Sequence, residues 1–311
     1  MKTMQAVRIH TYGGPEVLKY EEAPLPKPGP GEALVRVHAA GINPVDWKIR
    51  EGYFKGMNHS LPLILGWDLS GVVEATGSGV EGLKRDDQVY SRPDIARDGA
   101  YAEYIVVRET EVALKPKSID HIPAAAIPLA ALTAWQSLFG SAGLRADQKV
   151  LIHAAAGGVG SFAVQLAKWK GAYVIGTASK RNQDFVRKLG ADETLDYQAT
   201  RFEDVAHDVD VVFDTIGGDT QKRSWKVLRK GGILVSIVGP PSAEEAAAHG
   251  VRQASVFVQP SATQLTELAK LVDSGKLKPF VETVLPLSEA RRAHELSQTG
   301  HTRGKIVLRV V

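Results

Sequence analysis

The stretch LIHAAAGGVGSFAVQLAKWKGAYVIGTASKRN, residues 151–182, decides how this chain folds. The apolar run at 149–153 predicts a buried strand, and the spacing of apolar residues over 159–170 predicts a helix. Residues 172–177 predict a second buried strand. A strand, a helix and a strand in this order indicate a crossover unit, which belongs to a parallel sheet.

The turn between the first strand and the helix is crowded with small residues. It reads Ala155-x-Gly157-x-x-Gly160, a dinucleotide fingerprint with alanine in the first place. Ala155 suits the tight bend, Gly157 lets the backbone approach a pyrophosphate, and Gly160 lets the helix pack close to the sheet. We expect the phosphates to meet the N–H groups of the first helical turn, at Gly158 and Val159. The alternative is a tight strand–helix turn that binds no ligand.

The end of the second strand points to the type of dinucleotide. An NAD site places Asp or Glu there to accept from the ribose hydroxyls, but no acidic residue occurs between Gly160 and Gln183. Ser179, Lys180 and Arg181 stand there instead, and a hydroxyl with two cations suits a 2′-phosphate. This favours NADPH over NADH. The alternative is solvent-facing charge, although cations at a helix start oppose the helix dipole.

Composition excludes several classes of protein. The 311 residues contain no cysteine, so disulfides, thiol nucleophiles and thiolate metal sites are absent. Lys plus Arg number 38 against 35 Asp plus Glu, and they are scattered, so we expect no nucleic-acid partner. We expect no secretory signal, and the longest apolar stretch, 124–135, contains Pro128 and is too short to cross a bilayer. We expect a cytoplasmic protein with no membrane partner.

The pattern of elements divides the chain into three parts. Residues 1–122 read as short strands between Gly- and Pro-rich turns, with a helix at 44–50. Residues 123–272 alternate strands and helices, with a sixth strand at 255–258, and predict a doubly wound parallel sheet. Residues 273–311 end in a strand, KIVLRVV, that needs a sheet to join. We expect it to join the first part, so that domain is discontinuous.

Motifs along the whole chain resemble those of one family. Besides the glycine turn these are AAGINPVDWKIREG, LPLILGWDLSGVVEATGSGV, GAYAEY, LTAWQSL, KLGADETLDY, FDTIGG and GKIVL. The chain resembles the quinone oxidoreductase/zeta-crystallin branch of the medium-chain dehydrogenase/reductase superfamily. The resemblance implies an α/β Rossmann domain inserted in a β-rich, GroES-like catalytic domain.

The resemblance also bears on metal. Zinc-dependent members of the superfamily use a Cys and a His-Glu pair where this chain has Asn43, Trp67 and Asp68, and their four-cysteine structural lobe is missing. One carboxylate cannot hold a three-ligand catalytic zinc, so we expect no metal. The resemblance then implies hydride transfer from NADPH to quinones. An enal or enone reductase is the alternative, and a non-catalytic, crystallin-like NADPH-binding protein is the third reading.

Two residues are candidates for catalysis by resemblance. Asn43 would lie beside the nicotinamide and donate to a developing oxyanion, or else only form an Asx-turn before Pro44. Tyr53 is the aromatic candidate for the pocket and a possible proton donor, with core packing as the alternative. Asp46 is expected to cap or orient the turn after Asn43.

Further cofactor contacts are also implied by resemblance only. Thr133 would face the nicotinamide or its ribose, or else bond back to a helix carbonyl. The remaining candidates are Tyr197 near the adenosine phosphate, Asp214, Thr215 and Gly217 after the fourth strand, Gly239 after the fifth, Phe257 on the sixth, and Gly304 with Lys305 near the C-terminus. The strand SVFVQ at 255–259 could pair with its own copy, which predicts a homodimer.

Overall fold

The computed structural model describes residues 2–57 and 59–311 and divides the chain into two compact units. Unit 1 comprises Met1–Leu132 and Gln259–Val311, and unit 2 comprises Thr133–Val258. The domain bounds expected from the sequence, 1–122, 123–272 and 273–311, stay a prediction. The structure places α8 (Ala262–Asp273) in unit 1, where the Tyr90 hydroxyl donates to the carbonyl of Leu265.

Unit 2 is built on a six-stranded parallel sheet of order β11-β10-β9-β12-β13-β14. Its strands are β9 (Lys149–Ile152), β10 (Tyr173–Ala178), β11 (Glu193–Asp196), β12 (Val209–Asp214), β13 (Leu228–Ser236) and β14 (Arg252–Ser255). The chain starts at the centre, moves to one edge, and returns to build the other half. This order confirms the doubly wound prediction, and it puts the carboxyl ends of β9 and β12 side by side where a dinucleotide fold binds its ligand.

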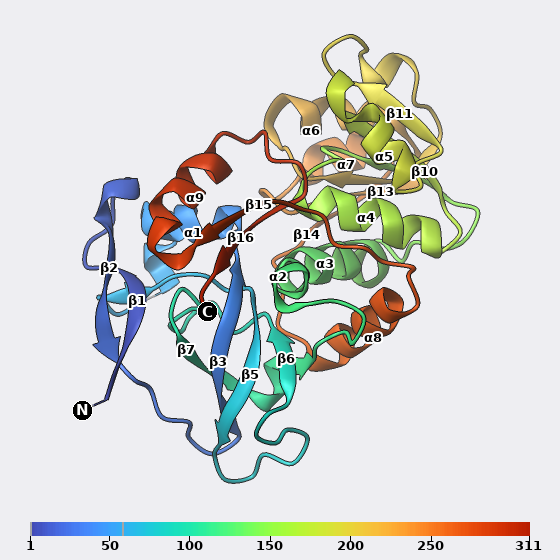
Figure 1. Cartoon of the computed structure of the whole chain (residues 1–311). Coiled ribbons are helices and arrows are strands. Elements are labelled where there is room, and N and C mark those ends of the chain that lie inside the picture. The colour runs from blue at the N-terminus through green and yellow to red at the C-terminus, as the bar shows by residue number, and fades with distance from the viewer. Residues whose placement is uncertain (1, 58) are drawn as a thin grey trace. The chain divides into compact units, whose positions relative to one another are not determined.

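Helices connect the parallel strands of unit 2 (Figure 1). They are α4 (Gly158–Trp169), α5 (Gln183–Lys188), α6 (Gly218–Ser224) and α7 (Ala243–His249), with a π-helical turn at Gln136–Ser141 after α3 (Pro128–Trp135). The core of this unit contains the apolar strand residues Leu151, Ile175, Val212 and Leu234, all at most 2% exposed. Continuously apolar strands are expected when helices cover both faces of a sheet.

The sixth strand of unit 2 differs from the prediction. We expected it at 255–258, but β14 spans Arg252–Ser255 and pairs in parallel with β13 from Ile233 to Ser236. The apolar residues Val256 and Phe257 misled the sequence reading. The ladder ends because β13 ends, and the last bond is donated by the Val256 amide to the Ser236 carbonyl.

Unit 1 holds the two other sheets. The larger has seven strands in the order β15-β16-β3-β5-β6-β8, with β7 also paired to β3, and the smaller has the order β2-β1-β4. The strands are β1 (Thr3–Ile9), β2 (Leu18–Pro24), β3 (Glu32–Gly41), β4 (Leu63–Ile64), β5 (Leu69–Thr76), β6 (Gln88–Ser91), β7 (Tyr104–Arg108), β8 (Val112–Leu114), β15 (Val281–Pro286) and β16 (Lys305–Arg309). Figure 1 shows the C-terminal β16, in red, beside the blue β3, with which it pairs antiparallel. This confirms that the terminal strand returns to the first sheet.

Short helices cover parts of unit 1. They are α1 (Pro44–Arg50), with the bounds predicted from the sequence, α2 (His121–Ala125), α8 and α9 (Ala290–Gln298). Gly300 follows α9 with a φ of +69°, a left-handed conformation that suits glycine. Within the described chain, none of the helices combines the length and the apolarity that crossing a membrane requires.

Candidate functional site

The glycine turn of unit 2 leaves β9 through a left-handed residue, Ala154, with a φ of +48°. The amide of Ala155 donates to the carbonyl of Thr177 on β10 at 2.9 Å, which fixes the bend against the sheet. Helix α4 then begins at Gly158, and the first turn of any α-helix leaves its N–H groups without intrahelical acceptors. Those N–H groups and the helix dipole make this turn suited to an anion.

Gly160 has the packing role expected from the fingerprint. A Cβ at this position would lie 2.2 Å from the Ala154 carbonyl oxygen, so no larger residue fits. At Gly157, by contrast, a Cβ would meet only the Ala154 carbonyl, at 3.3 Å. Gly157 therefore leaves open space on its other sides, which is what a closely approaching phosphate needs.

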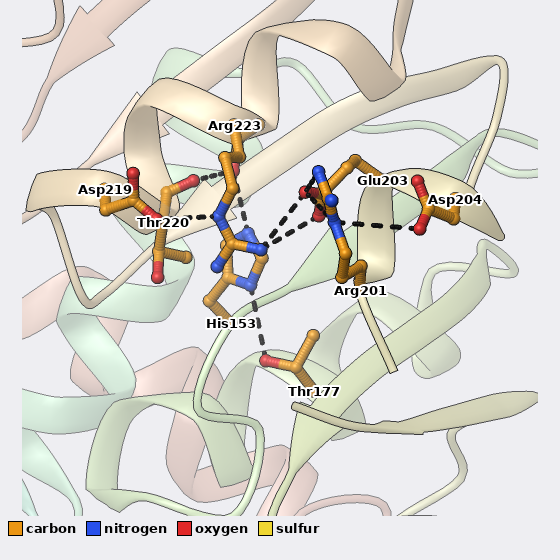
Figure 2. A network of polar contacts seen from close by, with 9 residues as sticks. His153, Thr177, Arg201, Glu203, Asp204, Asp219, Thr220 and Arg223 are labelled. Carbon is orange, nitrogen blue, oxygen red and sulfur yellow. Dashed lines mark hydrogen bonds and ion pairs between the residues drawn. The ribbon is translucent and has the colours of Figure 1, made fainter. Parts of the chain in front are cut away.

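A buried histidine joins the glycine turn to the rest of the sheet (Figure 2). Burial lowers the pKa of His153 to about 4, Arg223 acting in the same direction and Asp214 against it, so the imidazole is neutral at pH 7. The Ser224 hydroxyl donates to the Thr220 carbonyl at 2.7 Å, so it accepts from Nε2–H of His153 at 2.9 Å. That leaves Nδ1 of His153 as an acceptor.

Thr177 completes this chain of hydrogen bonds. Its hydroxyl lies 3.3 Å from Nδ1 of His153, to which it donates, and accepts from the amide of Ala154 at 3.2 Å. The hydroxyl of Thr215 donates to the His153 carbonyl at 2.8 Å. The left-handed Ala154 and the loop after β12 are therefore held through one residue, His153.

An aromatic ring and an ion-paired arginine pack over the imidazole of His153. The Phe202 ring stands edge-to-face on His153 with centroids 4.7 Å apart, and the Arg223 guanidinium lies 4.8 Å from the Phe202 ring centre. Glu203 accepts from Arg223 at 2.9 Å and forms an ion pair with Arg201 at 3.0 Å (Figure 2). These contacts keep water from the imidazole and so preserve the neutral, directional chain.

The end of β10 carries the cations that the sequence singled out. Ser179 precedes a 3₁₀ turn, Lys180–Asn182, and helix α5 begins only at Gln183, so the two cations lie before the α-helix. The side chains of Lys180 and Arg181 are exposed, and Asn182 donates to the Ser179 hydroxyl at 3.3 Å. The 3₁₀ turn places a hydroxyl and two cations at the carboxyl end of the second strand, where the ribose of a bound dinucleotide is expected.

The loop after β12 is held by hydrogen bonds to one buried carboxylate. Asp214 is fully buried, and its carboxylate accepts from the amides of Ile216 and Gly217, the amide side chain of Gln221 and the hydroxyl of Ser236 at 2.8–3.0 Å. Its oxygens are engaged in shaping the loop, so any part it plays in binding is through that loop. Gly217 has a φ of +77° and only glycine adopts it without strain.

The other cofactor candidates of unit 2 differ in exposure. Thr133 is 4% exposed, whereas Tyr197 and Phe257 are about half exposed. Gly239 is partly exposed, and a Cβ there would meet nothing within 4 Å. Their contacts with a cofactor stay predictions.

Unit 1 has its own buried polar cluster, centred on Asn43. The Asn43 Nδ2 donates to Asp68 at 3.1 Å, and its Oδ1 accepts from the ammonium of Lys305 at 2.5 Å. Lys305 also binds Asp68 at 3.1 Å and the Ile42 carbonyl at 2.9 Å. The ammonium fixes the amide oxygen and the carboxylate fixes the amide nitrogen, so the orientation of the Asn43 side chain is determined. The second Nδ2–H of Asn43 has no acceptor among the described residues.

A second branch of the cluster runs through Asp46. Its Oδ2 accepts from the Asn43 amide and from the Tyr101 hydroxyl, both at 2.7 Å, so Asp46 orients the turn as expected. Burial raises the pKa of Asp46 to about 7, although these two bonds lower it. Beyond Tyr101 lies His294, at 3.4 Å, and Arg50 donates to His294 at 3.1 Å.

Tyr53 and Gly304 lie at opposite extremes of burial. Tyr53 is 72% exposed, and its ring stands edge-to-face on Trp47 with the ring centroids 6.4 Å apart. It is therefore accessible to solvent rather than packed in the core. Gly304 is buried with a φ of +69°, and a Cβ would lie 2.4 Å from the Phe280 carbonyl oxygen. Both roles assigned to these residues stay predictions.

The positions that hold zinc ligands in related enzymes are occupied by other chemistry. Trp67 donates its indole N–H to the Arg97 carbonyl at 3.0 Å, and Asn43 and Asp68 share the Lys305 ammonium. Among the described residues no three His, Asp or Glu side chains gather in a metal-binding arrangement. Asn43 and Asp68, at two of the three positions, thus bind the ammonium group of Lys305.

Sequence reasoning missed several residues of these clusters. It named Lys305 only with Gly304 as a cofactor candidate, and it did not select Asp68, Tyr101, His153 or Thr177 as site residues. A lysine inside the apolar run KIVL and a histidine at the end of an apolar strand were the available signals, because buried polar groups need partners. Asp68 lies 237 residues from Lys305 in the sequence, and Ser224 lies 71 residues from His153, so sequence spacing could not identify these partners.

Comparison with known proteins matches both units. Residues 29–117 match a family model described as "Alcohol dehydrogenase GroES-like domain", and residues 189–308 match one described as "Zinc-binding dehydrogenase". The "NADPH-dependent alkenal/one oxidoreductase, chloroplastic" of Arabidopsis thaliana is 38% identical over 99% of this chain and 80% of its own length.

Two solved structures share the fold along the whole chain. The quinone oxidoreductase from Coxiella burnetii has a TM-score of 0.94 and 38% identity, and the match covers 100% of both chains. The Escherichia coli quinone oxidoreductase complexed with NADPH has a TM-score of 0.90 and 32% identity, covering 98% of this chain and 100% of the other. Both sets of findings agree with a GroES-like unit and a parallel-sheet unit in one chain.

Proposed function

Because the chain belongs to the quinone oxidoreductase branch of the medium-chain dehydrogenase/reductase superfamily, we propose that it transfers a hydride from NADPH to quinones without zinc. The observation that carries the proposal is the pairing of a dinucleotide turn with a hydroxyl and two cations at the end of β10. Hydride donation is the chemistry that NADPH supplies when bound. The chain itself must bind the dinucleotide, orient the acceptor and stabilise the charge that develops on it.

The residues of unit 2 fit a bound NADPH. Gly157 leaves room for the pyrophosphate, and the amides of Gly158 and Val159 lie in the first turn of α4. Lys180 and Arg181 would bind the 2′-phosphate with Ser179. The E. coli quinone oxidoreductase, whose solved structure is a complex with NADPH, supports the same choice.

Removing both cations tests the cofactor assignment. Lys180→Ala/Arg181→Ala should weaken NADPH binding at least tenfold and leave NADH binding nearly unchanged, because a hydrogen bond to a charged group contributes about 1.5–3 kcal/mol. Titration calorimetry with both cofactors measures this, with Lys188→Ala as the control for an exposed cation of the same segment. An unchanged preference for NADPH in the double variant would refute the role of the two cations.

The Asn43 cluster supports hydride transfer to a conjugated carbonyl. Such an acceptor gains the hydride at one atom and negative charge on its oxygen, and the free Nδ2–H of Asn43 could donate to that oxygen. Quinones and enones both meet this description. The Arabidopsis relative named as an alkenal/one oxidoreductase favours the enone alternative.

A panel of acceptors separates these readings. NADPH oxidation with 1,4-naphthoquinone, trans-2-hexenal and 4-phenyl-3-buten-2-one should be fastest with the quinone. Higher kcat/KM with the enal or enone would establish the alternative instead. NADPH binding without turnover of any acceptor would leave the crystallin-like, non-catalytic reading.

We retain two further expectations as proposals. We expected the segment SVFVQ, 255–259, to pair with its own copy, but of that segment only Ser255 lies in a strand, β14. β14 is the edge strand of its sheet, and we propose that it pairs with a second copy to form a homodimer. A monomeric mass by light scattering at micromolar concentration would refute this. We also propose a cytoplasmic location. The Arabidopsis relative is named as chloroplastic, so the location of this chain needs a direct test, which fractionation of the source cells provides.

A further inference from the structure

Arg92 is a buried cation whose side chain has no hydrogen-bond or ion-pair partner in the described part of the chain. It directly follows β6, and the residue is only 2% exposed. No hydrogen bond or ion pair joins its side chain to any of the residues 2–57 and 59–311 that the structure describes, and its Nε is sealed from solvent without an acceptor. A buried charge without a partner is costly, so such a group calls for an explanation.

The carboxylates around Arg92 are engaged elsewhere. Asp94 accepts from Arg108 at 3.1 Å and from the Ala96 amide at 3.0 Å. Glu111 accepts from the side chain and from the amide of Arg108, both at 3.2 Å. None of these contacts is to Arg92, whose guanidinium therefore keeps its donors for something else.

Arg92 nevertheless remains charged. Burial lowers its pKa to about 10, and the charges of Asp94, Glu111 and Asp68 oppose that effect. At neutral pH the guanidinium is protonated, and it presents donors in a planar fork that suits oxygen acceptors.

The strand register relates Arg92 to the Asn43 cluster. β5 and β6 are antiparallel with Leu69 opposite Ser91, so Asp68 and Arg92 occupy the next position along the two neighbouring strands. Asp68 holds both Asn43 and Lys305. The carboxylates whose charges act on Arg92 are Asp68, Asp94 and Glu111, and each of them is bonded to another group. The guanidinium donors of Arg92 are therefore available to an oxygen acceptor that gains negative charge.

From this placement we infer that Arg92 binds the carbonyl oxygen of the electron acceptor and stabilises the oxyanion that forms during hydride transfer. The inference rests on the proposed function. The acceptor carbon forms a bond to the hydride and is reduced while the nicotinamide is oxidised, and the electron pair of the conjugated system moves onto the carbonyl oxygen. Arg92 donates hydrogen bonds to that oxygen and keeps its own protons. A proton from water then neutralises the product.

Substituent effects test this role. Arg92→Met, compared with the exposed Arg85→Met as control, should lower kcat/KM for 4-aryl-3-buten-2-ones by about 10- to 100-fold without changing NADPH affinity. The loss should be smallest for aryl groups that withdraw electrons, so the Hammett slope should become steeper. Arg92→Lys should recover part of the rate because it keeps the charge. An unchanged rate, or an equal loss for every aryl group, would overturn the inference.

A second measurement needs no variant and no turnover. 4-Nitrophenol at about pH 6 should bind the NADP⁺ complex in its yellow, ionised form and compete with the acceptor, because its oxygen anion would accept hydrogen bonds from the Arg92 guanidinium. Binding of the colourless neutral form, or no binding, would contradict the role of Arg92. If the protein reduces no acceptor, the proposed function fails, while this absorbance change still decides on Arg92.

Discussion

Replacing Thr177 by valine tests the buried chain that shapes the glycine turn. Valine has the shape of threonine, so the substitution removes one hydroxyl and little else. That hydroxyl accepts from the Ala154 amide at 3.2 Å and donates to Nδ1 of His153 at 3.3 Å. Thr177 and His153 are 3% and 1% exposed, so water cannot easily replace the lost partner.

The expected loss follows from those two contacts. An unsatisfied buried polar group costs about 1–3 kcal/mol, and the substitution leaves two such groups without a partner, so the free energy of unfolding should fall by about 2–6 kcal/mol. The left-handed conformation of Ala154 is itself unfavourable by about 1–2 kcal/mol, so the turn should relax once its anchor is gone. NADPH and NADH should then bind more weakly by the same factor, because both carry the pyrophosphate.

Urea unfolding and cofactor titration of Thr177→Val measure both effects, with Thr177→Ser as the matched control. Serine keeps the hydroxyl, so the control should retain most of the stability and both affinities. Hydrogen exchange should also be faster at the Ala154 amide in the valine variant. If valine is as stable as serine at this position and binds NADPH equally well, the chain through His153 does not support the turn.

Two other predictions concern single residues, and a third concerns metal. Gly160→Ala should destabilise the protein by about 1–3 kcal/mol and weaken cofactor binding, because the new Cβ would lie 2.2 Å from the Ala154 carbonyl oxygen. The control Gly140→Ala places its Cβ in open space and should leave the thermal unfolding temperature nearly unchanged. Burial raises the pKa of Asp46 to about 7, so the stability that its protonated form contributes is greatest below pH 4 and is lost as pH rises through 7. Between pH 6 and 8 the free energy of unfolding of the wild type, measured in urea, should fall by about 1 kcal/mol. Asp46→Asn should not show this fall. Chelators should leave turnover unchanged, and inhibition reversed by added zinc would contradict the interpretation of Asn43 and Trp67.

The order of elements could be predicted because local patterns specify it. The apolar runs at β9, β10 and β12 and the small residues at Gly157 and Gly160 follow from the spacing of neighbours in the chain. α1 has its predicted bounds because Pro44 starts it and Asp46 accepts the Asn43 amide within three residues. Resemblance to a known family predicted in addition that a Rossmann domain is inserted in the sequence of a GroES-like domain.

The polar clusters could not be predicted because their members are distant in sequence. Lys305 meets Asp68 across 237 residues, and Arg50 meets His294 across 244. Whether a lysine in an apolar strand is buried with a partner depends on which strand lies beside it, and only the pairing of β16 with β3 determines that. β14 was misplaced for a related reason, since its partner β13 ends at Ser236 and the apolar residues beyond Ser255 have no strand to pair with.

The central claim is hydride transfer from NADPH to a quinone by a protein without zinc. Its most direct test is steady-state NADPH oxidation at 340 nm with 1,4-naphthoquinone, using protein freed of metal by a chelator and the same reaction with NADH beside it. We predict full turnover by the metal-free protein and a kcat/KM at least tenfold higher with NADPH than with NADH. No oxidation of NADPH by the metal-free protein, with activity restored by zinc, would contradict the account.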